Sequence, residues 1–263
     1  MTGSGGLDRP ILLTGGSGQV GYELNRRLGI FGEVFAPSRN ELDLAKPENV
    51  RRYVRGLKPV LIVNAAAYTA VDQAESDAGS AKVLNEGVPG LLGEEAKRLG
   101  AALVHYSTDY VFDGTKGSPY HEGDAPNPLS VYGSTKLNGE RAVQASGAAA
   151  VIFRCEWIYS KRGRNFLLTM LRLGKERPAL NIVSDQKGAP TWARAIAVAT
   201  TEVIARANES DSGMTGYFEK RAGVYHMAAS GFTTWFGFAE AIFEHAPEPR
   251  PVLTAISTDQ YPT

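Results

Sequence analysis

The sequence is poor in cysteine: Cys155 is the only one among 263 residues. A lone thiol has no partner for an internal disulfide, so we predict a reducing compartment, the cytoplasm. Because Cys155 follows the apolar residues 151–153, we expect its thiol to be a small buried group and not a nucleophile.

The sequence also lacks an excess of either charge, since 28 Lys and Arg residues balance 28 Asp and Glu residues. This balance gives no support to nucleic acid or an anionic membrane surface as a partner. The longest apolar stretch, residues 60–71, is interrupted by Asn64, Tyr68 and Thr69 and is too short to span a bilayer. Residues 1–9 lack the apolar segment of a signal peptide. We therefore predict a soluble protein with no membrane contact.

Histidine is scarce, and the four histidines are scattered along the chain. His121 precedes Glu122 and Asp124, which resembles a metal-ligand cluster, but the turn-forming residues around them predict a loop. We expect His105, within an apolar run, to be packed or hydrogen-bonded. The sequence therefore predicts no metal site.

What the chain has is a regular alternation of apolar runs and helical patterns, with 43% hydrophobic and 21% charged residues. Apolar runs of strand length occupy residues 11–14, 33–37, 60–66, 102–107, 149–154, 182–184 and 224–227. Helical patterns occupy residues 20–28, 47–56, 81–99, 135–144 and 194–206. Several runs are apolar on both faces, as in parallel strands covered by helices on both sides. The alternation predicts an α/β fold with a Rossmann-type, doubly wound parallel sheet.

The alternation weakens in two segments, which predicts a second, smaller part of the molecule. We expect residues 1–157 and 191–229 to form a dinucleotide-binding domain. Residues 158–190 and 230–263 are expected to form a small C-terminal lobe that covers the substrate. Ligands of doubly wound sheets bind at the carboxyl ends of the strands, so the loops there are the informative ones.

Three glycines, at positions 15, 18 and 21, follow the first predicted strand. Such a turn lets the backbone approach a pyrophosphate, while the next helix offers N–H groups and positive partial charge at its N-terminus. The spacing is G-x-x-G-x-x-G rather than G-x-G-x-x-G, so a tight turn of any α/β protein is the alternative interpretation. The strand before and the amphipathic helix after it favour a dinucleotide site.

Ser38 and Arg39 follow the second predicted strand, where the ribose 2′ position of a dinucleotide is read. A carboxylate there selects NAD, whereas a hydroxyl and a guanidinium suit a 2′-phosphate. We therefore predict NADPH, with a solvated surface arginine as the alternative interpretation. Glu41 and Asp43 come too late in this turn to be the expected ribose ligand. Asp43 is expected to cap the helix near Pro47 or to contact the adenine.

Tyr132 and Lys136 are four residues apart and share one face of a predicted helix. A free phenol is a poor acid at neutral pH, and a nearby ammonium is expected to lower the pKa of Tyr132 so that it exchanges a proton with a substrate oxygen. Lys136 is also suited to hold a ribose hydroxyl. Thr108, at the end of an earlier strand, offers a second hydroxyl, with Ser107 and Asp109 beside it. A tyrosine and a lysine at this spacing are also common on protein surfaces. The presence of Thr108 at the end of the preceding strand is what favours a catalytic role for the pair.

Four segments carry a resemblance to a known family: residues 107–114 (STDYVFDG), 131–137 (VYGSTKL), 64–72 (NAAAYTAVD) and 185–191 (DQKGAPT). Over residues 11–263 the chain resembles the dTDP-4-dehydrorhamnose reductases of the extended short-chain dehydrogenase/reductase superfamily. The resemblance implies NADPH-dependent reduction of dTDP-4-dehydro-L-rhamnose to dTDP-L-rhamnose, the last step of that pathway. It implies hydride transfer to the 4-keto group with Tyr132 as proton donor, and leaves NADH open as a second donor.

The resemblance also assigns roles to individual residues. The implied catalytic residues are Thr108, Tyr132 and Lys136. With the residues argued above, the cofactor site is expected to comprise Gly15, Gly18, Gln19, Val20, Gly21, Ser38, Arg39, Asp43, Leu44, Ala65, Ala66, Tyr68, Tyr132 and Lys136. The residues expected to face the sugar nucleotide are Thr69, Val71, Asp109, Tyr110 and Trp157. Glu23 matches a glutamate that some members place at a magnesium-linked dimer contact; we favour a solvated helix face, which leaves Mg²⁺ unsupported and a homodimer open.

The chain departs from the family pattern in two places. Cys155, Glu156 and Trp157 stand where members usually have Thr-Ser-Trp, so local substrate contacts are expected to differ. The chain stops at Thr263, where members continue, so the substrate lobe is expected to be truncated.

Two alternative functions stay open. One is a sugar-nucleotide epimerase or dehydratase, although dehydratases typically place Asp-Glu after the threonine, and here Asp109 and Tyr110 follow Thr108. The other is a non-catalytic regulatory subunit that resembles the beta subunit of methionine adenosyltransferase and acts by binding another protein.

Overall fold

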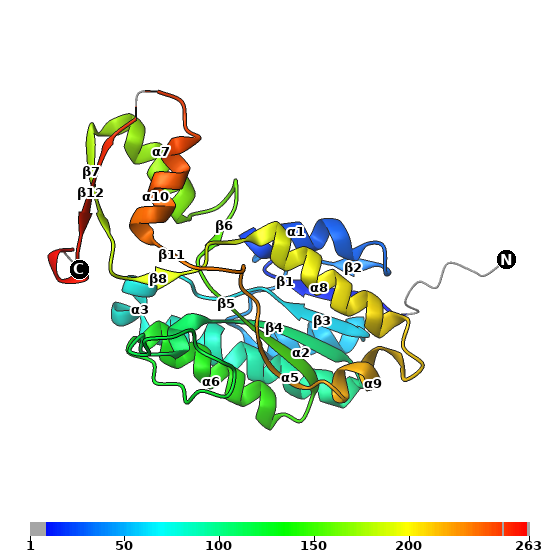
Figure 1. The fold of residues 1–263 in the computed structure, drawn as a ribbon. Helices are drawn as coiled ribbons and strands as arrows, with labels where there is room; N and C mark the ends of the chain where they lie inside the picture. Colours follow the sequence, from blue (N-terminus) through cyan, green and yellow to red (C-terminus); the bar gives the residue numbers. More distant parts are fainter. Residues whose placement is uncertain (1–8, 249, 262–263) are drawn as a thin grey trace. The chain divides into compact units, whose positions relative to one another are not determined.

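The computed structural model describes residues 9–248 and 250–261, and the chain forms two compact units (Figure 1). The first unit comprises residues 1–155 and 197–227, and the second comprises residues 156–196 and 228–263. Residues 1–8 and 262–263, at the ends of the two predicted domains, lie outside the described residues.

A parallel sheet of six strands, in the order β10-β5-β4-β3-β1-β2, forms the centre of the first unit. The strands are β1 Ile11–Thr14, β2 Val34–Phe35, β3 Leu61–Asn64, β4 Ala102–Thr108, β5 Ala149–Cys155 and β10 Gly223–His226. The four inner strands are buried along their whole length, as expected where helices cover both faces of a sheet. This arrangement confirms the predicted Rossmann-type fold, with the run predicted at residues 33–37 shortened to two residues of strand.

Helices cover both faces of this sheet (Figure 1). One face carries α1 Gln19–Leu28 and α8 Ala193–Asn208, and the other carries α2 Pro47–Leu57, α5 Val88–Leu99 and α6 Val131–Ala145. Shorter segments are α3 Val71–Ser76, α4 Ala78–Lys82, the 3-10 turn Asp109–Val111 and α9 Gly213–Glu219. The main apolar core joins the sheet to α2 and α5 through buried side chains such as Leu12, Val54, Ile62, Leu92 and Leu103.

The helix predicted over residues 81–99 is not one regular helix. Between α4 and α5 the chain makes a π-helical turn, Val83–Gly87, with Asn85 fully buried inside it. The amide of Asn85 binds the main chain of Tyr68, accepting from its N–H at 2.8 Å and donating to its carbonyl at 3.0 Å. A π turn inserts a residue into the helix, which a pattern of period 3.6 does not reveal.

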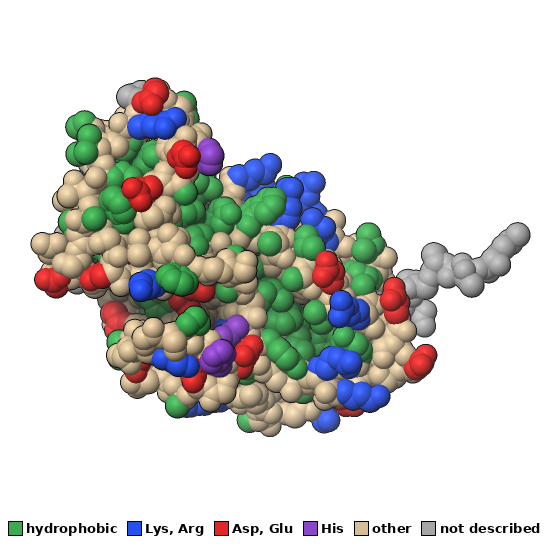
Figure 2. Space-filling view, in the orientation of Figure 1, with side chains coloured by type: hydrophobic (Ala, Val, Ile, Leu, Met, Phe, Trp, Pro, Cys, Tyr) green, Lys and Arg blue, Asp and Glu red, His purple; other side chains and the backbone are tan. Residues whose placement is uncertain are grey.

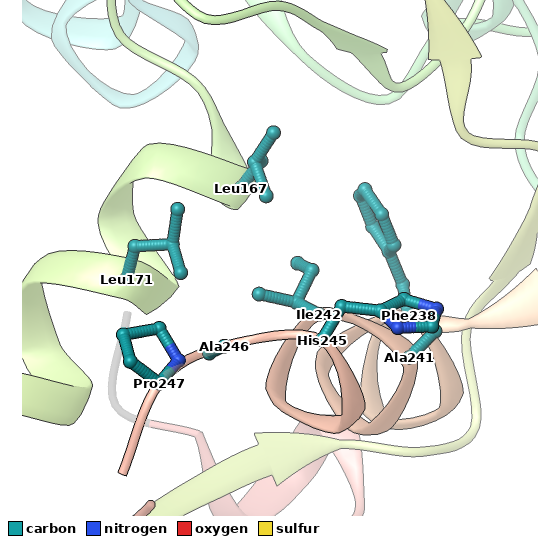
Figure 3. A pocket seen from close by; sticks show the side chains of 8 residues that line it. All are labelled: Leu167, Leu171, Phe238, Ala241, Ile242, His245, Ala246 and Pro247. Atoms are coloured by element: carbon teal, nitrogen blue, oxygen red, sulfur yellow. The ribbon is translucent and has the colours of Figure 1, made fainter. Parts of the chain in front are cut away.

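The second unit combines three short strand pairs with two helices, α7 Phe166–Glu176 and α10 Trp235–Glu244. The parallel pairs are β6 Ile158–Tyr159 with β9 Thr191–Trp192, and β7 Ala179–Val183 with β12 Val252–Ile256; β8 Lys187–Gly188 and β11 Thr233–Thr234 pair antiparallel. A 3-10 turn, Thr258–Gln260, follows β12. The apolar run predicted at residues 182–184 overlaps the end of β7. Leu167 and Leu171 of α7 face Phe238 and Ile242 of α10 across an apolar hollow (Figure 3).

Basic and acidic side chains both occur across the face drawn in Figure 2, in line with the balanced charge of the sequence. Among the described residues, no helix has the length and apolar character needed to cross a membrane.

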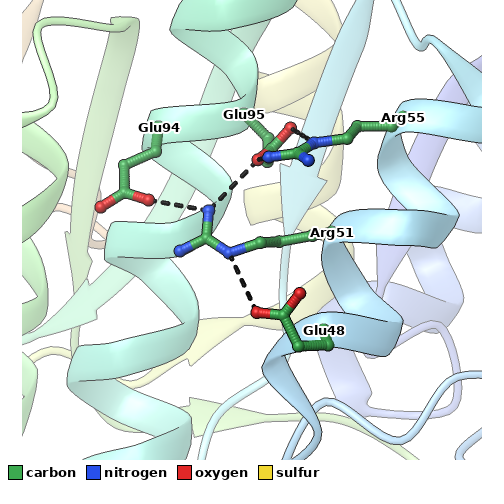
Figure 4. A network of polar contacts seen from close by, with 5 residues as sticks. All are labelled: Glu48, Arg51, Arg55, Glu94 and Glu95. Atoms are coloured by element: carbon green, nitrogen blue, oxygen red, sulfur yellow. Dashed lines mark hydrogen bonds and ion pairs between the residues drawn. The ribbon is translucent and has the colours of Figure 1, made fainter.

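A charged network ties α2 to α5 (Figure 4). Arg55 of α2 binds both carboxylate oxygens of Glu95 on α5, at 2.8 and 2.6 Å, and Arg51 reaches the same carboxylate at 3.2 Å. The Glu95 side chain is only 2% exposed, whereas that of its neighbour Glu94 is 58% exposed. Hydrogen bonds from Arg55 lower the pKa of Glu95 against the opposing effect of burial. A bidentate bond to a buried carboxylate is the strong form of an ion pair.

We expect Glu95→Gln to lower the free energy of unfolding by about 2 kcal/mol at pH 7, because two arginines lose their common partner. The matched control is Glu94→Gln, which removes an exposed partner of Arg51 and should change stability by less than about 0.5 kcal/mol. Urea denaturation measures both. Because the pKa of Glu95 is lowered in the fold, its contribution is present above its ordinary pKa and disappears as the pH falls through the folded value. Equal losses in the two variants would contradict the assignment.

Candidate active site

The turn between β1 and α1 is shaped by its glycines. Gly15 has φ +73°, and a Cβ placed on it would lie 2.6 Å from the main chain of Ala65, at the end of β3. A Cβ on Gly21, within α1, would lie 2.1 Å from the carbonyl oxygen of Gly15. The turn is therefore pressed against both the next strand and its own helix, a geometry that only glycine permits.

The N-terminus of α1 opens toward this turn. Gly18 is its N-cap, makes no side-chain cap bond, and is followed by Gln19 and Val20 without an acidic residue in the first turn. The first N–H groups of a helix have no partner within the helix and carry positive partial charge. The cradle and the helix end together fit the pyrophosphate of a dinucleotide.

The end of β2 differs from expectation in one respect. Ser38 and Arg39 are exposed there, but Ser38 is engaged: its N–H and its hydroxyl both donate to a carboxylate oxygen of Glu41, each at 2.7 Å. These bonds lower the pKa of Glu41. Glu41 was expected to lie too late in this turn to reach the end of β2, but its carboxylate contacts Ser38 there.

Asp43 does not cap α2, so that part of the sequence interpretation is wrong. Its carboxylate accepts from the N–H of Ala45 at 3.0 Å, and the N-cap of α2 is Lys46. Leu44 packs against the main apolar core. The helix begins with Pro47, which has no N–H and therefore leaves one fewer donor to satisfy at this end.

A row of buried polar groups crosses the carboxyl end of the sheet. The Thr14 hydroxyl donates to Asn64 at 2.6 Å, and the Asn64 amide lies 3.1 Å from Nδ1 of His105. Burial, with the nearby Lys136 charge as a second cause, holds the pKa of His105 well below its usual range, so His105 is neutral. The expectation that His105 is packed and hydrogen-bonded is confirmed.

Tyr132 and Lys136 both lie buried on α6, 9% and 2% exposed. Thr108, at the end of β4, lies beside Tyr132 and acts on its pKa, and the Thr108 hydroxyl itself donates to the Asp109 carboxylate at 3.0 Å. The Lys136 ammonium donates to the Tyr106 carbonyl at 2.6 Å. Tyr132 also packs with Tyr68 and Val71, and its ring meets that of Tyr110 edge-on at 5.4 Å. The structure thus brings the predicted catalytic residues together with several predicted ligand contacts.

Hydrogen bonds at the N-terminal end of α6 and a glycine in its first turn place the helix beside the end of β4. The Ser130 hydroxyl caps it at the Gly133 N–H, 3.0 Å away, and Glu75 accepts from the Val131 N–H at 2.8 Å. A Cβ on Gly133 would lie 2.1 Å from the carbonyl oxygen of Tyr110, so glycine lets the helix touch the loop after β4.

The expected lowering of the Tyr132 pKa is wrong for this structure. Burial raises the pKa of Tyr132 above its usual range, a rise that the neighbouring Thr108 side chain opposes. Burial also lowers the pKa of Lys136 to about 8, a change that Glu140 opposes. Desolvation acts against the charged form of both groups and is the largest cause of each shift. Tyr132 is therefore a protonated hydroxyl group at neutral pH.

Three residues behind the site form a network, of which the sequence interpretation had named only Ser107. Glu140, four residues after Lys136 on α6, accepts two bonds from Arg154, at 2.9 and 2.7 Å, and one from Ser107 at 2.5 Å. Glu140 and Arg154 are nearly fully buried. A glutamate one turn beyond Lys136 on the same helix face was the available signal.

Cys155 is buried, as predicted, and pairs in register with Thr108 across β4 and β5. Glu23 is buried as well, so the expected solvated position is wrong: it shares the inward face of α1 with Val20 and Leu24. Within residues 9–248 and 250–261, no group of three or more His, Cys, Asp and Glu is placed to hold a metal ion.

Trp157 belongs to the second unit. It has the unusual φ of +42° and stacks on Trp235 with ring centroids 3.5 Å apart. A Cβ on Gly188 would lie 2.4 Å from the Trp157 ring, so the segment 185–191 packs tightly against it. The positive φ is a strained conformation for a bulky residue, which the stack and the glycine contact hold in place.

A Rossmann-type sheet with a glycine cradle and a buried Tyr-Thr-Lys set is the arrangement of a nucleotide-dependent oxidoreductase. Comparison with known proteins defines the class further. A family model described as RmlD substrate binding domain matches residues 9–263. The dTDP-4-dehydrorhamnose reductase of Burkholderia thailandensis is 49% identical over 259 residues, covering 96% of this chain and 86% of that protein. The reductase of the same name from Escherichia coli K12 is 44% identical, covering 96% and 85%.

Solved structures agree with these relatives. The dTDP-4-dehydrorhamnose reductase of Bacillus anthracis, in complex with NADP, superimposes with a TM-score of 0.86 at 32% identity, covering 97% of this chain and 87% of that one. The chain therefore belongs to the dTDP-4-dehydrorhamnose reductase family, a family of oxidoreductases.

Proposed function

We propose that this protein reduces the 4-keto group of dTDP-4-dehydro-L-rhamnose to give dTDP-L-rhamnose, with NADPH as the hydride donor. The substrate is the one named for its relatives, at up to 49% identity among those compared. The observation that carries the proposal is the burial of Tyr132 and Lys136 one helical turn apart on α6, with Thr108 beside Tyr132 at the end of β4. When bound, a reduced nicotinamide supplies the hydride for the carbonyl carbon.

The residues of the chain supply the remaining steps. The carbonyl oxygen accepts hydrogen bonds from Tyr132 and Thr108, which polarise it. Burial keeps Tyr132 protonated, so Tyr132 has a proton to deliver as negative charge develops on that oxygen. The Lys136 charge lies on the same helix face and stabilises that charge in a site of low dielectric constant.

The cofactor site of this proposal includes Gly15, Gly18, Gln19 and Val20 in the cradle, and Ser38 and Arg39 at the ribose. The substrate site of this proposal includes Thr69, Val71, Asp109 and Tyr110 of the first unit. The small residues and open helix end after β1 support the cofactor site. The packing of Val71 and Tyr110 with Tyr132 supports the substrate site.

An assay of NADPH oxidation with dTDP-4-dehydro-L-rhamnose tests the function. We expect absorbance at the nicotinamide band to fall in a 1:1 ratio to product, because a reductase consumes its cofactor. Turnover with bound NAD and no added reductant would instead favour an epimerase or dehydratase. Absence of turnover together with a stoichiometric protein partner would favour the regulatory subunit.

Tyr132→Phe should lower kcat by at least about 100-fold, since it removes the proposed proton donor. Dinucleotide binding, followed by nicotinamide fluorescence, should stay within a few-fold of the unmodified protein. Tyr53→Phe, a half-buried tyrosine on α2, is the control and should retain normal turnover. Near-normal rates for Tyr132→Phe would remove Tyr132 from the mechanism.

The pH dependence should follow Lys136. Its pKa is lowered to about 8 by burial, so the ammonium is charged below that pH and loses its proton as the pH rises through it. We therefore expect kcat/KM, which reports the free enzyme, to fall on the alkaline side of this value. Circular dichroism over the same range checks that the fold persists. A flat profile to pH 10 would show that the charge is not required.

A further inference from the structure

The turn after β2 carries an acidic side chain in a fixed position. Glu41 Oε2 accepts from the N–H and from the hydroxyl of Ser38, both at 2.7 Å. The main chain closes the same turn, with the N–H groups of Glu41 and Leu42 donating to the Ser38 carbonyl at 3.1 and 2.9 Å. The Glu41 carboxylate is therefore held against Ser38 at the end of β2, on an exposed turn.

This carboxylate lies in the part of the fold that meets a dinucleotide ribose. β2 runs beside β1, pairing Leu12 with Phe35. The residue after β2, Ala36, has its Cβ 3.1 Å from the position that a Cβ on Gly16 would take. The turn after β2 is thus adjacent to the glycine cradle. In Rossmann folds an acidic residue about 20 positions after the glycine motif hydrogen-bonds the ribose 2′-hydroxyl, and Glu41 stands at that separation from Gly21.

Charge at this place acts differently on the two nicotinamide cofactors. A carboxylate accepts up to four hydrogen bonds, so Glu41 retains capacity for a ribose hydroxyl after binding Ser38. A 2′-phosphate brings negative charge against it and finds both Ser38 donors already taken. Arg39, exposed on the same turn, has the opposite effect because its guanidinium attracts a phosphate.

We propose that Glu41 is a cofactor-specificity residue that weakens binding of NADPH relative to NADH and thereby opposes Arg39. This inference rests on the proposed function only in that a dinucleotide binds at the glycine cradle. It assigns a role to a residue that sequence position alone had set aside.

The competing explanation is that Glu41 only closes the turn. Glu41→Gln separates the two, because the glutamine amide oxygen still accepts from Ser38 while the negative charge is gone. Glu33→Gln is the matched control: it removes the same charge from an exposed position just before β2, at the opposite end of the strand. Arg39→Gln provides the reverse change.

Equilibrium titration of nicotinamide fluorescence gives the Kd of NADH and of NADPH for each protein without turnover. We expect Glu41→Gln to raise the affinity for NADPH relative to NADH by roughly fivefold or more at low salt. Arg39→Gln should move the ratio the other way, and Glu33→Gln should leave it within about twofold. The Glu41 effect should shrink near 1 M salt, since screening acts on charge and not on turn geometry.

An unchanged ratio in Glu41→Gln, or an equal change in Glu33→Gln, would overturn the inference while leaving the proposed function intact. Equal weakening of both cofactors would assign Glu41 to the turn alone and also overturn it. Failure of the unmodified protein to bind either dinucleotide would overturn this inference and the proposed function together.

Discussion

The burial of one ammonium group governs the arrangement of the first unit. Lys136 is 2% exposed, and a charge out of water is tolerated only where other groups compensate for the lost hydration. The Tyr106 carbonyl accepts a hydrogen bond from this ammonium, and Glu140 provides opposite charge one turn along α6. Glu140 is fixed in turn by Arg154 of β5. Strands β4 and β5 and helix α6 therefore meet around a chain of charges that alternate in sign, and the phenol of Tyr132 sits at its edge.

The same compensation explains how the strand ends can be polar without being hydrated. Thr14, Asn64 and Nδ1 of His105 follow one another across β1, β3 and β4, each with a hydrogen-bond partner, while Nε2 of His105 is buried without one. Glycine then sets the distances: Gly15 admits the end of β3, and Gly133 admits the loop after β4. The two features are linked, because a buried polar group needs a hydrogen-bond partner close by, and small residues let the backbone segments that carry such partners approach each other.

Much of this was predictable where signals are local. The glycine turn after residues 11–14, the inner strands, and Tyr132 with Lys136 on one helix face all follow from periodicity and spacing. Prediction failed where the outcome depends on partners distant in sequence. The π turn at Asn85 depends on hydrogen bonds to Tyr68, which is 17 positions earlier. The burial of Glu23 depends on packing beyond its own helix. Strand β7 pairs with β12, a segment 73 positions away (Ala179 with Val252). The direction of the Tyr132 pKa shift depended on depth of burial, which spacing does not report.

The path of the chain has a consequence for the order in which the molecule can assemble. The first unit is left after Cys155, rejoined at Ala197 and left again after Met227, so the second unit is built from two separate stretches. Five of the six strands of the large sheet lie within the first 155 residues. In the second unit, β7 can pair only after β12, which comes near the end of this sequence, has been made. During synthesis on the ribosome the first unit can therefore collapse early, while the second unit acquires the partner strand of β7 only when nearly all of this sequence has been translated.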